Sequence, residues 1–205
     1  MPLPTDAQLL LALCMLGGAA LYSAVGHAGA SAYIALMALF GIPAAVMRPT
    51  ALVLNVFVAS FVSWRYARAG LFRWRTVWPI LIGSVPLAFY GGSVQLPGHL
   101  YRPLVGLVLL ASAARFLWPE PFSNEPEQED PSIPLAIASG AAIGLLSGLT
   151  GTGGGIFLSP LLIFMTWSTT KGASGVAAVF ILCNSMAALA GNLASVKALP
   201  SELPL

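Results

Sequence analysis

The stretch GLLSGLTGTGGGIFLSPLL, residues 144–162, is the most unusual part of this sequence. It holds six glycines from Gly144 to Gly155, and apolar segments flank it on both sides. A glycine inside a helix costs about 1 kcal/mol relative to alanine, and three of these glycines are consecutive. The stretch therefore predicts a break between two helices rather than one continuous helix.

The composition around this stretch is that of a membrane protein. Of the 205 residues, 58% are hydrophobic and only 8% are charged, whereas a soluble domain has about 25% charged residues. Residues 7–119 and 131–201 contain no carboxylate. Carriers of cations and protons usually place Asp or Glu inside the bilayer. A polar cargo is therefore expected to be an anion or a neutral molecule.

Apolar segments along the chain predict an all-α, polytopic membrane protein. A helix needs about 20 residues to cross a bilayer, and two of the segments, 30–42 and 155–168, are shorter than this. Each of these two follows a glycine-bearing stretch, and short apolar stretches are typical of half-helices or re-entrant segments. The full set of segments is 7–25, 30–42, 50–66, 76–93, 101–118, 134–150, 155–168 and 174–194.

An acidic, proline-rich segment at 119–133 divides the chain into two halves. Such a composition is typical of a flexible linker in water. We therefore expect a first transmembrane repeat at 1–118 and a second at 134–205.

The two halves resemble each other in the order of their glycines. When the second half is moved back by 125 positions, Gly151 falls on Gly26 and Gly154 falls on Gly29. Repeated halves are the usual plan of secondary transporters. The second half ends at Leu205, before counterparts of the last two helices of the first half, so the second repeat is expected to be incomplete. Either the chain is a truncated product, or the assembly supplies the missing packing surface in another way.

The relative direction of the two repeats is left open by the sequence. The four arginines of the loop 65–75 predict that this loop is cytoplasmic. If equivalent loops face opposite sides, the repeats are inverted, and 30–42 has to count as a crossing. If the short segments return to the same side, the repeats are parallel. The inverted arrangement is favoured.

The glycine break has two explanations. Glycine adopts positive φ readily, and a break before a helix presents unpaired N–H groups and the positive end of the helix dipole, which predicts an oxyanion site near the middle of the bilayer. The alternative is close helix packing through small residues four positions apart, such as Gly144 and Gly148. The residues predicted to bind the anion are Gly151, Thr152, Gly153, Gly154 and Gly155.

Further polar residues are candidates for the same path. Gly26 and His27 lie in the first copy of the break, with His27 at the position of Thr152. His27 could donate to an anion or titrate near neutral pH and couple transport to protons, or it could bond to a neighbouring helix. Asn55 and Asn184 lie within long helices, where an amide either lines a path or holds helices together.

Arg48 and Lys171 are predicted to follow a short helix and precede a long one. Their positions differ by 123, close to the offset between the repeats. They could attract anions at the mouth of a path, or they could extend to the lipid headgroups as ordinary interfacial residues.

The second glycine stretch carries a family resemblance. SGLTGTGGGIFLSPLL, residues 147–162, followed by GASGVAAVFILCNSMAALAG, residues 172–191, resembles the sulfite exporter TauE/SafE family. Members carry the pattern G-x-G-G-G-x-x-x-x-P-x-L in each half. The first copy, VGHAGASAYIALM, departs from the pattern and has no proline. The matching residues are Gly151, Gly153, Gly154, Gly155, Pro160 and Leu162.

The resemblance implies a multi-pass protein of the inner (plasma) membrane that exports sulfur-containing anions such as sulfite or organosulfonates. The sequence has no Ser-His-Asp set, metal-ligand cluster or nucleotide-binding cassette, so we expect no enzyme activity, no cofactor and no metal, and transport driven by a gradient. The expected partners are a small anionic substrate and the lipid bilayer, with no nucleic acid, and a homo-oligomer is left open. The alternative function is a non-transporting membrane subunit for assembly or binding.

Overall fold

The computed structural model describes residues 4–24, 26–71, 73–117 and 129–197, and all regular structure within them is α-helical. Each predicted apolar segment corresponds to one helix, so the all-α fold class is confirmed. Residues 119–128 of the predicted linker lie outside the described residues. The helices are α1 (Thr5–Ala24), α2 (Ala30–Leu39), α3 (Ala44–Arg68), α4 (Trp74–Ser93), α5 (Gly98–Leu117), α6 (Ile133–Thr150), α7 (Gly155–Phe164) and α8 (Thr170–Lys197).

Two helices begin four or more residues earlier than the apolar pattern predicts. α3 begins at Ala44, after Pro43 in an extended conformation, and α8 begins at Thr170. Arg48 and Lys171 therefore lie inside the first turns of these helices, and the prediction that they precede them is wrong. The reason is that a helix can continue through charged residues, which an apolar pattern excludes.

The predicted break in the second half is confirmed. α6 ends at Thr150, and Gly151 follows with φ 81° in the left-handed region. Gly154 has φ 77° and stands directly before α7. For an L-residue with a side chain, this conformation costs roughly 1–2 kcal/mol. Glycine avoids that cost and therefore allows the chain to reverse here.

The first half contains a break of the same kind. Gly26 and Gly29 have φ values of 82° and 90°, and α2 begins directly after Gly29. α2 and α7 are each 10 residues long. Their first residues, and likewise their last, are separated by the same 125 positions that relate the glycines.

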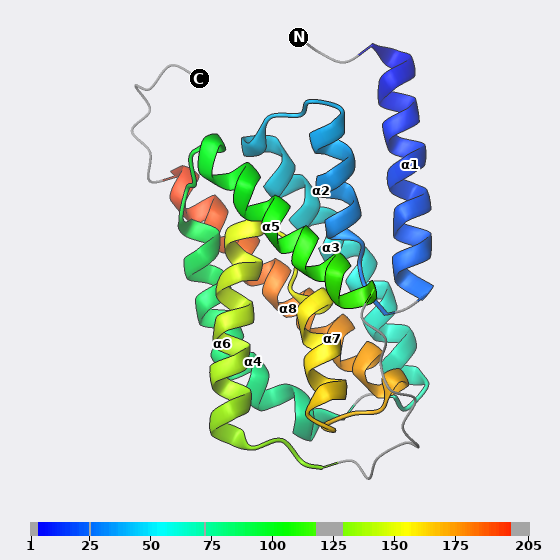
Figure 1. Ribbon diagram of the computed structural model, residues 1–205, viewed down its shortest axis with the longest axis vertical. Helices are drawn as coiled ribbons and strands as arrows, with labels where there is room; N and C mark the ends of the chain where they lie inside the picture. The colour runs from blue at the N-terminus through cyan, green and yellow to red at the C-terminus, as the bar shows by residue number, and fades with distance from the viewer. Residues whose placement is uncertain (1–3, 25, 72, 118–128, 198–205) are drawn as a thin grey trace.

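The two helical hairpins point in opposite directions along the long axis of the molecule. In Figure 1, α1 runs downward and α2 turns back up, whereas α6 runs upward and α7 turns back down. Both reversals lie near the middle of the long axis. This opposite polarity favours inverted over parallel repeats.

The short helix α2 returns toward the end from which α1 came, so these two helices add no net passage along the molecule. Whether the two repeats as a whole are inverted or parallel stays a prediction.

α4 is the central packing element, because α6 and α8 both pack closely against it. A Cβ atom added at Gly144 would lie 2.6 Å from Cα of Ser84, and one added at Gly148 would lie 2.9 Å from N of Gly92. Small residues at this spacing allow backbones to approach closely. The two explanations of the glycine stretch therefore apply to different residues: Gly144 and Gly148 serve packing, whereas the left-handed glycines that follow serve the break.

Four described helices, α1, α3, α6 and α8, are long and apolar enough to cross a membrane.

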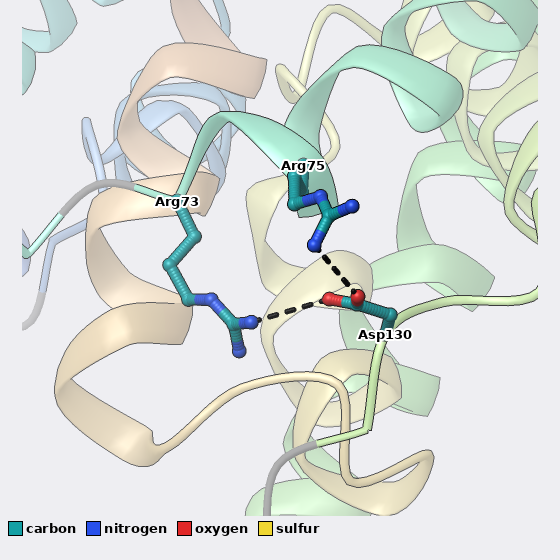
Figure 2. A network of polar contacts seen from close by, with 3 residues as sticks. All are labelled: Arg73, Arg75 and Asp130. Carbon is teal, nitrogen blue, oxygen red and sulfur yellow. Dashed lines mark hydrogen bonds and ion pairs between the residues drawn. The ribbon is translucent and has the colours of Figure 1, made fainter.

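The segment before α6 is tied to the start of α4 by an ion-paired cluster, in which Arg73 and Arg75 contact the carboxylate of Asp130 at 3.2 and 3.3 Å (Figure 2). These groups are largely exposed, and such pairs contribute at most about 1 kcal/mol. The chain is a multi-pass helical membrane protein held together mainly by packing.

The α4–α6 contact generates a stability prediction. We expect Gly144→Ala to lower the free energy of unfolding by about 1–3 kcal/mol, because the added methyl group forces the two helices apart. The measurement is denaturant unfolding in detergent micelles. Gly106→Ala in α5 is the matched control, since no atom lies within 4 Å of the added Cβ. Equal effects of the two substitutions would contradict the packing role of Gly144.

Candidate functional site

The two glycine breaks lie against each other inside the molecule. Nε2 of His27, in the first break, lies 3.3 Å from Oγ of Ser159 in α7. A Cβ atom added at Gly155 would lie 3.3 Å from Cδ2 of the same histidine. His27 is buried, so a polar side chain from the first half contacts the second half at the point where α7 begins.

Helices α3 and α8 bring two more polar side chains to this place. Nδ2 of Asn55 donates to Oγ of Ser185 at 3.3 Å. A Cβ atom added at Gly153 would lie only 2.6 Å from Nδ2 of Asn55 and 3.3 Å from Oγ of Ser185. Asn55 and Ser185 are both fully buried, and Oδ1 of Asn55 has no hydrogen-bond partner among the described residues.

Three backbone amides of the second break have no partner among the described residues. In the described part of the chain, no hydrogen bond satisfies the N–H groups of Gly153, Gly154 or Gly155, and all three residues are buried. The amides of Ala28 and Gly29 in the first break are in the same state. An unpaired buried N–H group costs several kcal/mol in an apolar environment, so each of these donors calls for a ligand.

The carbonyl groups next to the breaks have partners. The hydroxyl of Tyr101 in α5 donates to the carbonyl of Thr150 at 2.8 Å, at the end of α6. The hydroxyl of Tyr33 in α2 donates to the carbonyl of Ala28 at 2.6 Å. These two acceptors are satisfied, whereas the nearby amides are not.

A buried positive charge lies beside the second break. Arg48 is 4% exposed, and a Cβ atom added at Gly151 would lie 3.1 Å from its Cγ. The guanidinium donates to carbonyls at the end of α4, with Nη1 2.7 Å from the oxygen of Val94 and Nη2 2.7 Å from that of Gly91. Nη2 also donates to the carbonyl of Gly92. A cation is favourable at a helix C-terminus.

No carboxylate of the described residues balances the charge of Arg48. The ion pairs found among the described residues involve Asp130 alone as the acid, and the sequence has no acidic residue between 7 and 119. Nε of Arg48 is buried and has no hydrogen-bond partner in the described structure. The arrangement of donors and charge around the second break therefore suits an anion.

The other predicted residues occupy different environments. Thr152 is buried, and its hydroxyl lies 2.9 Å from that of Thr150. Gly26 packs on α8, since a Cβ added there would lie 2.8 Å from the carbonyl oxygen of Ser174. Lys171 is exposed and precedes Ser185 by about 21 Å along α8 at 1.5 Å per residue.

Asn184 is fully buried in α8, and neither polar atom of its amide has a partner among the described residues. It lies between Ile181, whose side chain contacts the glycine stretch, and Ala188, which contacts α4. Whether Asn184 lines a path stays a prediction, as does the role of Arg48 and Lys171 at a mouth.

Sequence reasoning missed Ser159, Ser185, Tyr33 and Tyr101. Ser185 directly follows Asn184, a predicted site residue, and this adjacency could have indicated Ser185. Tyr101 gives no such signal, because it is 49 residues from the carbonyl that it caps.

A helical chain with several membrane-spanning helices and a buried polar break where its halves meet defines a polytopic membrane protein. The chain belongs to the Sulfite exporter TauE/SafE family, whose model matches residues 10–203. A protein of Sinorhizobium fredii (strain NBRC 101917 / NGR234), named "Probable membrane transporter protein y4hK", is 42% identical over 186 residues, which cover 89% of this chain and 75% of that protein. No solved structure gives a significant match. The protein is therefore a membrane transporter of this family.

The position of Arg48 generates a second stability prediction. We expect Arg48→Met to lower the free energy of unfolding by about 3 kcal/mol or more, because it leaves several buried carbonyls of α4 unpaired at about 1–3 kcal/mol each. Arg102→Met, at an exposed position of α5, is the control and should change stability little. Denaturant unfolding in micelles measures both, and a loss at Arg48 no larger than at Arg102 would contradict the capping role.

Proposed function

We propose that the protein is a secondary transporter that exports small sulfur-containing oxyanions, such as sulfite or organosulfonates, across the inner membrane. One observation carries this proposal: three buried amides without partners among the described residues follow Gly151, which contacts the side chain of the buried Arg48, and no described carboxylate pairs with that arginine. Family membership supports the transport class. The choice of sulfur-containing anions rests on the description of the family.

The bound anion would satisfy the donors that the protein leaves unpaired. Its oxygens would accept hydrogen bonds from the amides of Gly153, Gly154 and Gly155, which precede or begin α7. Successive amides in a turn conformation form concave anion sites, and the N-terminus of α7 adds the positive end of its dipole. The hydroxyl of Thr152 and the ring of His27 would be the side-chain donors.

Selectivity against cations follows from the same groups. A cation needs oxygen ligands, and the carbonyls of Ala28 and Thr150 already accept hydrogen bonds from tyrosine hydroxyls. The charge of Arg48 would repel a cation and attract an anion. The site would therefore discriminate by charge before it discriminates by shape.

Alternating access would use the contact between the two breaks. His27 and Ser159 join the two hairpins, which point in opposite directions (Figure 1). Rocking of one hairpin against the other would open the midpoint to one side and then to the other, as in repeat-based transporters. A gradient would supply the energy, and His27 is the group in the break that can exchange a proton near neutral pH.

Sulfite flux in proteoliposomes tests the proposed site. We expect Gly154→Ala to reduce sulfite transport about tenfold, because strain of roughly 1–2 kcal/mol at positive φ displaces the amides, and 1.4 kcal/mol corresponds to a factor of ten. Gly17→Ala in α1 is the control, since its added Cβ meets no atom within 4 Å, and it should keep full transport. Transport unaffected by Gly154→Ala would show that the anion does not use this break.

A second pair of variants separates hydrogen bonding from packing. Thr152→Val keeps the volume of the side chain but removes its hydroxyl, and a hydrogen bond to a charged group contributes about 1.5–3 kcal/mol. We therefore expect Thr152→Val to raise the KM for sulfite about tenfold or more, whereas Thr152→Ser should stay near the original KM. Equal KM values for the two variants would exclude the hydroxyl as a ligand.

The alternative proposal is a non-transporting membrane subunit for assembly or binding. It is favoured by α1, none of whose residues is buried. The flux assay separates the two functions, because an assembly subunit would carry no sulfite under any condition.

A further inference from the structure

A groove with a volume of about 580 Å³ lies between the last turns of α1 and α3. Both helices are long and apolar enough to cross a membrane, and Figure 1 shows α1 at the edge of the molecule, beside α3. Ala20 and Ala24 of α1 line the groove and are exposed. The groove is therefore open to the surrounding bilayer.

The wall formed by α3 changes from apolar to polar along the helix. Phe61 and Val62 come first, and Arg65 and Tyr66 follow one turn later. Ala69, which also lines the groove, directly follows the end of α3. At about 1.5 Å per residue, the wall from Phe61 to Ala69 extends roughly 12 Å. The groove thus has an apolar inner section and a charged outer section.

Trp64 places the outer section at the level of the lipid headgroups. It is 53% exposed and directly precedes Arg65 in the sequence. Tryptophan is enriched where a membrane protein passes from hydrocarbon to water, and α3 ends soon afterwards at Arg68. A lipid molecule in the groove therefore has its headgroup beside Arg65 and its chains beside Phe61.

Arg65 gives the groove a positive charge that no acid of the described residues neutralises. The ion pairs found among these residues all use Asp130, and Arg65 takes part in none of them. Its guanidinium lies 5.9 Å from the centre of the Phe61 ring, which also lines the groove. Sequence positions 7–119 contain no carboxylate, so charge complementarity favours an anionic headgroup.

A free oxyanion matches only one end of this groove. It would pair with Arg65 but would leave the apolar wall uncovered. It would also fill little of a volume that lies in the range of about 300–1,000 Å³, which is typical of sites for larger organic ligands. An amphiphile matches both ends at once, and basic pockets between transmembrane helices bind the headgroups of anionic lipids.

We propose that the groove between α1 and α3 is a binding site for an anionic phospholipid such as phosphatidylglycerol. The lipid phosphate accepts hydrogen bonds from the guanidinium of Arg65 and the hydroxyl of Tyr66, and one acyl chain lies along Phe61 and Val62. A guanidinium pairs with phosphate through two parallel N–H groups. Phosphatidylcholine binds less well, because its own choline cation offsets the charge of its phosphate.

The lipid site adjoins the first break. The N–H group of Gly26 donates to the carbonyl of Ser23, which lines the groove, at 3.2 Å. None of the residues of α1 is buried, so an acyl chain in the groove supplies packing that this helix otherwise lacks. The site is separate from the anion site proposed at the second break, and lipid binding there does not depend on transport.

Native mass spectrometry of the delipidated protein in micelles tests the proposal. The protein is titrated with phosphatidylglycerol or with phosphatidylcholine of the same acyl chains. We expect phosphatidylglycerol to bind about tenfold more tightly, and Arg65→Gln to remove this preference, because a hydrogen bond to a charged group is lost. Arg68→Gln is the matched control, since Arg68 shares the last turn of α3 but does not line the groove. It should keep most of the preference.

A second pair of variants tests the apolar section of the groove. Ala20→Trp fills the groove and should weaken the binding of phosphatidylglycerol. Leu21→Trp is its control, because Leu21 is exposed on the same helix but does not line the groove, and it should bind the lipid as the original chain does.

Four results would overturn the proposal. The first is equal binding of the two lipids, and the second is an equal loss of preference in Arg65→Gln and Arg68→Gln. The third is displacement of phosphatidylglycerol by an equal concentration of glycerol phosphate, because the groove would then hold a free anion without chains. The fourth is a dimer of the lipid-free chain that Ala20→Trp dissociates, because the occupant would then be a second copy.

Discussion

The structure depends on the cost of leaving backbone donors unpaired inside an apolar environment. A continuous helix pairs its own amides, whereas a broken helix exposes those of its first turn. In this protein, two helical segments are broken near the middle of the molecule's long axis, and both breaks are buried (Figure 1). The glycines allow the chain to reverse, because they adopt positive φ without steric strain. The same reversals leave buried amides that water cannot reach. The architecture around the breaks can be understood as a response to that constraint.

The polar backbone groups at the breaks are satisfied unevenly, since some carbonyls have hydrogen-bond partners and several amides do not. Tyrosine hydroxyls from α2 and α5 satisfy carbonyls at the two breaks, and Arg48 satisfies the carbonyls at the end of α4. The amides of Gly153, Gly154 and Gly155 receive nothing from the described residues. Open donors of this kind suit a negative ligand, and the sequence places no carboxylate between residues 7 and 119 or between 131 and 201 to compete with it.

α4 connects the packing of the molecule to this site. Its glycines and those of α6 allow the two backbones to touch, and the carbonyls at its end accept hydrogen bonds from the guanidinium of Arg48, whose Cγ lies near Gly151. The same helix therefore fixes the position of α6, which leads into the break, and the position of the nearby charge. No described helix packs against α1 as α4 packs against α6, so the first hairpin has fewer constraints than the second.

The sequence by itself determined the helices, the two breaks and the family. Hydropathy and consecutive glycines are local signals, and they located α2 and α7 because a short apolar run after a left-handed glycine has few other solutions. Only the tertiary structure decided which side chains meet at the breaks. His27 contacts Ser159 across 132 residues, and Asn55 contacts Ser185 across 130. Arg48 was expected before its helix and instead lies within it, capping α4. Such contacts depend on how the helices pack against one another, and no local pattern of residues records that.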